Sequence, residues 1–253
     1  MLTKNLRANV AVALAALLIV SCQKDISEEL PVATDKVKTY TEDITWSTGG
    51  HDVTTFNLNY DGNNRITSVV SAADPGNKFV YTYPSANTVI SELYIGNSLG
   101  IHYEAYYKDN RIDSAFQYND TGDSSTEKHL YNSSGEWIKS YEYDYSKSTG
   151  AVLSNTITYT YDGNGNQVKS EDTDTNVETF EYYADKVYIS PQIGPSQMPV
   201  VKRNLIKSHT VFSNGSEVGT GSLTYTFDNS DRISTITEQT DDGSVVIKTF
   251  TYY

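Results

Sequence analysis

The chain has 253 residues and a net charge of −13, because 32 aspartates and glutamates outnumber 19 lysines and arginines. Such an acidic surface argues against nucleic acid as a partner, since its phosphates require clustered lysine and arginine, and against electrostatic adhesion to anionic lipid. The single cysteine excludes an internal disulfide, so a chain of this length must be stabilised by a buried core.

The start of the chain has the pattern of a secretory signal. Lys4 and Arg7 precede an apolar segment over residues 8–20, and Cys22 stands shortly after it. A membrane span needs roughly 20 apolar residues, whereas this segment is shorter and contains Asn9. We therefore interpret the segment as an exported leader rather than a transmembrane anchor.

The four residues Ile19-Val20-Ser21-Cys22 resemble the bacterial lipobox. The resemblance implies that the chain is cut before Cys22 and that lipid is attached to the thiol and the new amine of this residue. We predict a signal peptide over residues 1–21, whose removal changes the net charge from −13 to −15 because Lys4 and Arg7 leave with it. Residues 22–36 are then the acylated cysteine and a flexible tether, since residues 23–36 are polar and lack aromatic side chains.

The tether carries acids close to the predicted lipid. Lys24-Asp25 and Glu28-Glu29 resemble the acidic signal that sends Bacteroidetes-type lipoproteins to the cell surface, although Ile26 and Ser27 interrupt it here. An ordinary solvated linker explains the same composition. We predict a lipid anchor in the outer membrane of the cell envelope, with membrane contact through Cys22, and leave open which side of that membrane the protein faces.

Beyond the tether the chain repeats a short unit, which consists of an aromatic strand end, a turn rich in Asp, Asn and Gly, and an aliphatic strand start. The copies lie at residues 58–66, 107–112, 130–138, 159–168 and 225–233, with a degenerate sixth at 182–187. Asp, Asn and Gly tolerate the positive φ of tight hairpin turns, and Gly62 and Gly163 are expected to supply it. Asp61 with Arg65, and Asp228 with Arg232, are expected to bridge their own turns.

Polar and apolar residues alternate on both sides of these turns. Phe56, Leu58 and Tyr60 share one predicted face, and so do Trp137 and the tyrosines at 141, 143 and 145. No stretch after residue 36 shows a helical period. The spacing predicts one all-β domain over residues 37–253, an antiparallel meander of about 14–17 hairpin-connected strands, rolled or barrel-like so that its edges are covered. Three prolines at residues 191–199 indicate a long loop or an interruption between two sheet halves.

The repeated unit is similar to the Tyr-Asp repeat of the Rhs family. Together with the lipobox, it resembles uncharacterised Bacteroidetes lipoproteins described as having a porin-like β fold. The resemblance covers most of residues 50–253 and implies a fold without an established activity. Long Rhs arrays enclose a toxin, but this chain has few copies and no attached toxin domain. The face opposite the aromatics carries Thr, Asn, Ser, Glu and Lys, which lipid would reject, so we do not expect a membrane-spanning channel.

Residues 96–100 match the Gly-x-Ser-x-Gly pattern of a hydrolase nucleophile, with Ser98 at its centre. That motif requires a strand before it and a helix after it, whereas residues 101–107 read as another strand. We therefore interpret Ser98 as a hairpin residue. His102 lies nearby, but the sequence defines no ordered set of serine, acid and histidine, and we predict no catalytic residue.

Residues 172–176 offer the alternating oxygens of a calcium loop, and Asp172 and Asp174 are the first candidates. The loop lacks the required Gly and Glu, because Val177 and Tyr183 occupy those positions, and turn chemistry explains the acids more simply. The four histidines show no zinc-ligand spacing. We predict no bound metal and no cofactor.

Two functions remain open. Trp46, Trp137 and some tyrosines offer a platform on which sugars stack, which favours a non-enzymatic module that binds a glycan or an envelope protein. The alternative is a secreted hydrolase with its site in the loops at the barrel mouth, since two of the many acids can meet as a catalytic pair. Convergent acids, or an acid with His102, in a deep pocket would favour the enzyme, and a filled barrel with exposed tryptophan would favour binding.

Overall fold

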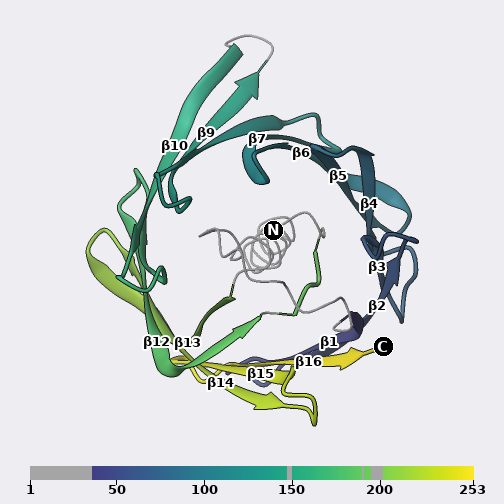
Figure 1. Ribbon diagram of the computed structural model, residues 1–253, viewed down its shortest axis with the longest axis vertical. Helices are drawn as coiled ribbons and strands as arrows, with labels where there is room; N and C mark the ends of the chain where they lie inside the picture. Colours follow the sequence, from purple (N-terminus) through teal and green to yellow (C-terminus); the bar gives the residue numbers. More distant parts are fainter. Residues whose placement is uncertain (1–35, 147–149, 190, 195–201) are drawn as a thin grey trace.

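A computed structural model describes residues 36–146, 150–189, 191–194 and 202–253, which form a closed barrel of sixteen antiparallel strands (Figure 1). Each strand pairs with its neighbours in sequence, and the barrel closes where the first strand pairs with the last. The strands are β1 (Val37–Thr45), β2 (His51–Tyr60), β3 (Ile66–Ser71), β4 (Lys78–Ser85), β5 (Thr88–Ile95), β6 (Ser98–Lys108), β7 (Arg111–Asn119), β8 (Ser124–Tyr131), β9 (Trp137–Ser146), β10 (Gly150–Tyr161), β11 (Gln167–Glu171), β12 (Asn176–Ile189), β13 (Lys202–Ser213), β14 (Ser216–Phe227), β15 (Ile233–Thr240) and β16 (Val245–Tyr252). The predicted all-β meander of 14–17 strands is confirmed.

The barrel has two unlike ends. Lys36 and Tyr253 meet at one of them, where the Tyr253 amide donates to the Lys36 carbonyl at 3.1 Å. We call this the terminal end; it also holds the turns that follow the even-numbered strands. The distal end holds the turns that follow the odd-numbered strands. The predicted interruption near residues 191–199 does not split the sheet, because β12 pairs directly with β13.

Five copies of the repeat form hairpins at the terminal end, and the longer ones share one turn. In the first copy, the Asp61 amide donates to the Arg65 carbonyl, and Asp61 Oδ1 accepts the amides of Asn63 and Arg65, each at 2.9 Å. The positive φ falls on the fourth residue, Asn64, at 65°. Gly62 is not among the residues with positive φ. Gly62 and Asn63 have the right-handed backbone of the turn, and Asn64, which follows them, is left-handed.

The same correction applies to the copy at 159–168. Its positive φ of 80° falls on Gly165 and not on Gly163. The predicted turn in the sixth copy is wrong, because residues 182–187 belong to β12. The pairing of β12 with β13 shifts its register between Tyr182 and Val187. The predicted turn bridges are confirmed, with Asp61 to Arg65 and Asp228 to Arg232 both at 2.7 Å.

These two glycines provide a matched pair of variants. Gly165→Ala is expected to lower the free energy of unfolding by about 1 kcal/mol, because alanine resists a φ of +80°. Gly163→Ala is expected to be neutral or slightly stabilising, since an added Cβ meets no atom within 4 Å and the φ is ordinary. Urea unfolding of both variants measures the difference, and equal losses would contradict the assignment of the turn.

A girdle of tyrosines closes the hairpins at the terminal end. In each of seven hairpins, a tyrosine of the even-numbered strand donates its hydroxyl to a main-chain carbonyl of the preceding strand, at 2.6 to 2.9 Å. The donors are Tyr60, Tyr83, Tyr131, Tyr161, Tyr182, Tyr225 and Tyr252. This contact explains the tyrosine before the turn in the copies at 58–66, 130–138 and 159–168, whereas the copy at 225–233 has Phe227 there and makes the contact from Tyr225.

Arginine completes the repeat from the neighbouring hairpin. The guanidinium of Arg65 lies over the ring of Tyr83, and that of Arg232 over the ring of Tyr252, each 4.2 Å from the centroid. The same two arginines donate Nε to the aspartates of their turns at 2.8 Å. One repeat therefore links a turn, the strand after it and the girdle tyrosine of the next hairpin.

The one remaining even-numbered strand of the described barrel, β6, is the exception. The buried hydroxyl of its tyrosine, Tyr107, has no hydrogen-bond partner among the described residues. Tyr225→Phe is expected to cost about 1 kcal/mol of stability, because the Ile206 carbonyl loses its donor, whereas Tyr107→Phe is expected to be nearly neutral. Thermal unfolding compares the two, and an equal loss in both would contradict the girdle.

Apolar side chains face the barrel interior. The larger buried cluster draws on β1 to β4 and β13 to β16, and Ile193 packs against it from the short stretch 191–194, which lies within the outline of the ring (Figure 1). On β14, half-buried Leu223 and Tyr225 alternate with exposed Ser222 and Thr224, as expected for a barrel wall with one wet face.

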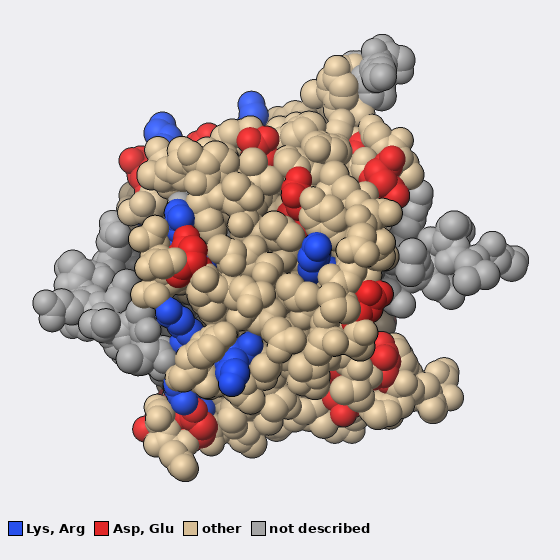
Figure 2. All heavy atoms as spheres, turned by 90° about the vertical axis from the view of Figure 1, so that its right-hand side faces the viewer, with Lys and Arg blue, Asp and Glu red and all other residues tan. Residues whose placement is uncertain are grey.

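The outer wall is polar over much of the barrel. Threonine hydroxyls pair across neighbouring strands on it, as in Thr39 with Thr251 at 2.7 Å and Thr41 with Thr55 at 2.9 Å. Figure 2 shows charges of both signs scattered among neutral side chains on the wall over β2 to β5. The hydroxyls and charges give this part of the wall the polar composition expected from the sequence, and its exclusion from lipid stays a prediction. No helix within the described ranges is long and apolar enough to cross a membrane.

Candidate functional sites on the two faces of the wall

Aromatic side chains gather on the outer wall over β5 to β9. The burial along β6 defines the two faces, since Ala105 is 3% exposed, Tyr106 41% and Tyr107 7%. Tyr106 therefore points outward. His102 lies on the same face. Its Nδ1 is 3.2 Å from Glu92 Oε1, and its ring stacks on that of Tyr118 with the centroids 4.6 Å apart.

Two rows of outward aromatics flank a strip of hydroxyl groups. Ala115 of β7 and Glu127 of β8 are paired on the inner face, so the outward residues are Phe116 and Tyr118 on β7 and Ser124 and Thr126 on β8. On β9, Tyr143 lies opposite Thr126, and Tyr145 lies opposite Ser124. We call these six residues the outer aromatic strip. Its two rows lie two strands apart, which is about 10 Å.

The structure does not bring Trp46 and Trp137 together. Trp46 is 40% exposed in the β1–β2 turn at the distal end, whereas Trp137 begins β9 at the terminal end. Trp137 points inward, against His129 at 4.3 Å and Tyr159 at 5.1 Å. The prediction of a single platform that includes both tryptophans is therefore wrong, because the two side chains lie at opposite ends of the barrel.

A β-bulge explains why Trp137 lies on the face opposite the β9 tyrosines. Tyr131 pairs with Trp137, but Leu130 pairs with Lys139, so one residue is extra at the start of β9. An extra residue reverses the alternation for the rest of a strand. Tyr141, Tyr143 and Tyr145 therefore point outward, which simple alternation from Trp137 did not predict.

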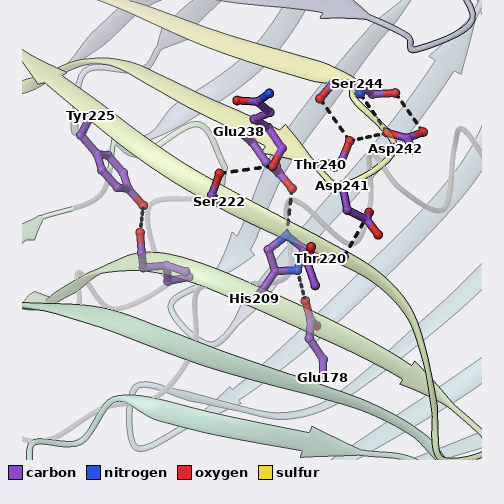
Figure 3. Close-up of polar contacts among 12 residues, drawn as sticks. Glu178, His209, Thr220, Ser222, Tyr225, Glu238, Thr240, Asp241, Asp242 and Ser244 are labelled. Atoms are coloured by element: carbon purple, nitrogen blue, oxygen red, sulfur yellow. Dashed lines mark hydrogen bonds and ion pairs between the residues drawn. The ribbon is translucent and has the colours of Figure 1, made fainter.

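On the inner face, His209 of β13 bridges two carboxylates (Figure 3). Its Nδ1 lies 3.1 Å from Glu178 Oε1 on β12, and its Nε2 lies 2.9 Å from Glu238 Oε1 on β15. These hydrogen bonds, first that to Glu178, raise the pKa of His209 to about 9 against the opposing effect of burial. The imidazolium in turn lowers the pKa of Glu238.

Glycine on the intervening strand makes this bridge possible. Gly221 of β14 lies directly opposite His209, and a Cβ placed on it would approach His209 Nε2 to 2.1 Å. The imidazole therefore crosses β14 through space that any other residue would occupy. On the far side of Glu238, Lys248 lies 3.8 Å from Glu42 and extends the ionic row onto β1.

A second inner cluster lies on β8 and β9. Buried His129 has its Nδ1 3.2 Å from Ser140 Oγ and its Nε2 3.6 Å from Glu127 Oε2. Glu142 lies directly opposite Glu127 on β9. Burial, and then the charge of Glu142, raises the pKa of Glu127 to about 7, while burial lowers the pKa of His129 to about 4. At neutral pH the pair therefore holds a neutral imidazole beside a carboxyl group that is near the midpoint of its titration.

Sequence reasoning missed both inner clusters. An acid or a histidine inside an otherwise apolar alternation, such as Glu178 beside Phe180, was the available signal. Pairing them required the register of strands that lie up to 60 residues apart, as between Glu178 and Glu238.

The remaining sequence candidates occupy turns or lie outside the described residues. Ser98 starts β6 directly after the β5–β6 turn, which confirms it as a hairpin residue. Both carboxylate oxygens of Asp172 accept hydrogen bonds from Asn176 in the β11–β12 turn, which also holds Asp174. Among the described ranges, no three His, Cys, Asp or Glu side chains gather as metal ligands, and Asp172 and Asp174 stay untested as calcium candidates. Cys22 and the tether precede the described residues.

Comparisons with known proteins bear on the fold. No family model matches the sequence, and no curated protein matches it. A solved porin-like protein from Bacteroides uniformis superposes with a TM-score of 0.61, covering 87% of this chain and 98% of that chain at 12% identity. A TcdB2-TccC3 structure gives a TM-score of 0.25 at 9% identity, covering 80% of this chain and 14% of that chain. The first likeness shows a porin-like fold.

Proposed function

We propose that the protein is a lipid-anchored envelope protein that binds a glycan at the outer aromatic strip without chemically changing it. The observation that carries the proposal is the pairing of Phe116 and Tyr118 with Tyr143 and Tyr145 across the hydroxyls of β8. Sugar rings present apolar faces that stack on aromatic rings, and hydroxyl edges that exchange hydrogen bonds with serine and threonine. An aliphatic patch of the same size would favour a protein or lipid partner instead.

The predicted anchor is compatible with access to this strip. Lys36 lies 14 positions after Cys22, and an extended chain of that length reaches about 50 Å. The barrel can therefore stand clear of the bilayer with its outer wall in water. The porin-like fold and the Cys22 lipobox both support a place in the cell envelope.

A glycan array probed with the chain from Lys36 onward tests the proposal. We expect binding to a restricted set of glycans. The double variant Tyr118→Ala, Tyr143→Ala is expected to lose at least tenfold in affinity, because the stacking of sugar rings on two tyrosine rings is removed. Val53→Ala, which trims an exposed residue on β2, serves as the control and should bind as the wild type does. If no glycan on the array is bound, or if the double variant binds as well as the wild type, the proposal is contradicted.

The hydrolase alternative draws support from Glu127 and Glu142, which face each other on adjacent strands, and from the pKa of Glu127, which burial and then the charge of Glu142 raise to about 7. Such a pair is the arrangement of an acid and a base or nucleophile. It lies on the inner wall rather than in mouth loops. Release of reducing sugar from captured glycans, abolished by Glu127→Gln, would establish this function in place of simple binding.

A further inference from the structure

Three buried polar atoms lack a hydrogen-bond partner among the described residues, and all three come from adjacent strands. They are Tyr107 Oη on β6, Arg111 Nε on β7 and His129 Nε2 on β8. Buried donors left unpaired cost roughly 1 to 3 kcal/mol each, so each one calls for an explanation. Their concentration in one sector of a sixteen-stranded wall indicates a local cause.

The repeat supplies its own comparison for two of these atoms. On each of the other seven even-numbered strands, the hydroxyl of the girdle tyrosine has a main-chain carbonyl partner. The Nε equivalent to Arg111 has an aspartate partner in the turns of Arg65 and Arg232. The turn before Arg111 contains two residues, Asp109 and Asn110, both with positive φ. In the longer turns an aspartate lies four residues before the arginine, whereas Tyr107 occupies that position here.

The three residues lie around two neighbouring aromatic rings, those of Tyr131 and Trp137. The guanidinium of Arg111 lies over Tyr131 at 5.5 Å from the centroid. Tyr107 pairs with Ile112, the residue after Arg111, and its pKa is raised by burial and then by Tyr83 and Tyr131. Trp137 joins the third atom to the group, since its ring lies 4.3 Å from His129 and 6.5 Å from Tyr131.

We propose that Tyr107 and Arg111, with His129 beside them, form an inward-facing site for a small oxyanion, the carboxylate or phosphate group of a ligand. A phenol O–H and a guanidinium N–H are both donors, and a guanidinium matches carboxylate and phosphate geometry. Tyr107 is 7% exposed, so its hydroxyl meets little competing water. Neutral His129 donates through Nε2 when its Nδ1 accepts the Ser140 hydroxyl.

Glu127 is the carboxyl group beside the site, with Oε2 3.6 Å from His129 Nε2. Its ionised form repels an anion, whereas its neutral form can donate a hydrogen bond. Burial favours that neutral form, because it raises the pKa of Glu127 to about 7. The site is therefore suited to a single small anionic group rather than to a polyanion.

Isothermal titration of the chain from Lys36 onward with sodium phosphate, and separately with sodium acetate, tests the inference. Sodium chloride at matched ionic strength is the control for screening. We expect saturable binding of one of the two anions, which also tells whether the group is a phosphate or a carboxylate. Binding of neither would overturn the inference. The glycan array does not depend on this site, so the two proposals fail separately.

Matched variants localise the site. Tyr107→Phe and Arg111→Lys are each expected to weaken binding at least tenfold. Their repeat equivalents Tyr161→Phe and Arg65→Lys change donors that already have partners, and should bind the anion as the wild type does. Tyr107→Phe removes no existing hydrogen bond, so the folded barrel is retained for the measurement. Unchanged affinity in both Tyr107→Phe and Arg111→Lys would contradict the assignment.

Discussion

His209→Gln is expected to lower the free energy of unfolding by about 3 kcal/mol at pH 6 and to remove much of its pH dependence between pH 6.5 and 9. The folded pKa of His209 is raised to about 9 from an ordinary 6.5 by Glu178 and Glu238. A raised histidine pKa stabilises fully below pH 6.5, where the group is charged in both states. The stabilisation is then lost as the pH rises through 9.

Urea unfolding followed by tryptophan fluorescence at pH 6, 7.5 and 9 measures this difference. His51→Gln is the control, because His51 contacts Asp43 at 2.8 Å but its side chain is 57% exposed, where an ion pair contributes little. A His209→Gln variant that keeps the slope of the wild type would show that the two glutamates do not hold the proton.

Gly221→Ala tests the same bridge without touching a titrating group. Because the added Cβ would stand 2.1 Å from His209 Nε2, the imidazole must leave its position between the glutamates. We expect Gly221→Ala to reproduce the flattened pH profile of His209→Gln. Gly219→Ala, two residues away on β14, meets only Asp241 at 3.8 Å and should preserve the profile.

Glu127 and His129 are expected to have pH effects of opposite sign that offset each other between pH 4.5 and 6.5. The folded pKa of Glu127 is raised to about 7, so its contribution to stability falls as the pH rises from 4.5. The folded pKa of His129 is lowered to about 4, so its contribution grows as the pH rises toward 6.5. Folding thus moves a proton from the imidazole to the carboxyl group with little net uptake.

Single variants separate the two effects. His129→Gln is expected to leave the effect of Glu127, a loss of up to about 1.4 kcal/mol per pH unit as the pH rises. Glu127→Gln should leave the effect of His129, a gain of the same size. Slopes of stability against pH, relative to wild type, are the measurement, so a constant loss from altered packing does not enter. Slopes of the same sign in the two variants would contradict the pairing.

The sequence predicts the barrel well because its signals are local. Alternating side chains and repeated Asp-rich turns lie within about ten residues of each other, and they define hairpins without knowledge of the whole sheet. Local chemistry also placed Ser98 in a hairpin and joined Asp61 to Arg65. What it did not give was which loop residue takes the positive φ, since both Gly62 and Asn64 tolerate it.

The sites escaped prediction because they depend on register. One bulged residue at the start of β9 sent Trp137 inward and Tyr143 outward, and no composition signal marks that residue. The bridge at His209 needs strands β12, β13 and β15 in their final alignment, with a glycine at the crossing point on β14. The local sequence pattern identifies the inward-facing acids and histidines but does not show which of them contact each other in the fold.

The pairing of β1 with β16 has a kinetic consequence. It joins residues at opposite ends of the described barrel, as in the contact of Thr39 with Thr251 across 212 positions. Contacts between such distant residues form slowly, because the chain must lose the entropy of a long loop before they stabilise it. Hairpins can form as the chain emerges, but ring closure waits for the last strand. Until then the edges of β1 and of the growing sheet are open to pairing with other chains, so we expect the protein to depend on protection from aggregation during its synthesis and transport.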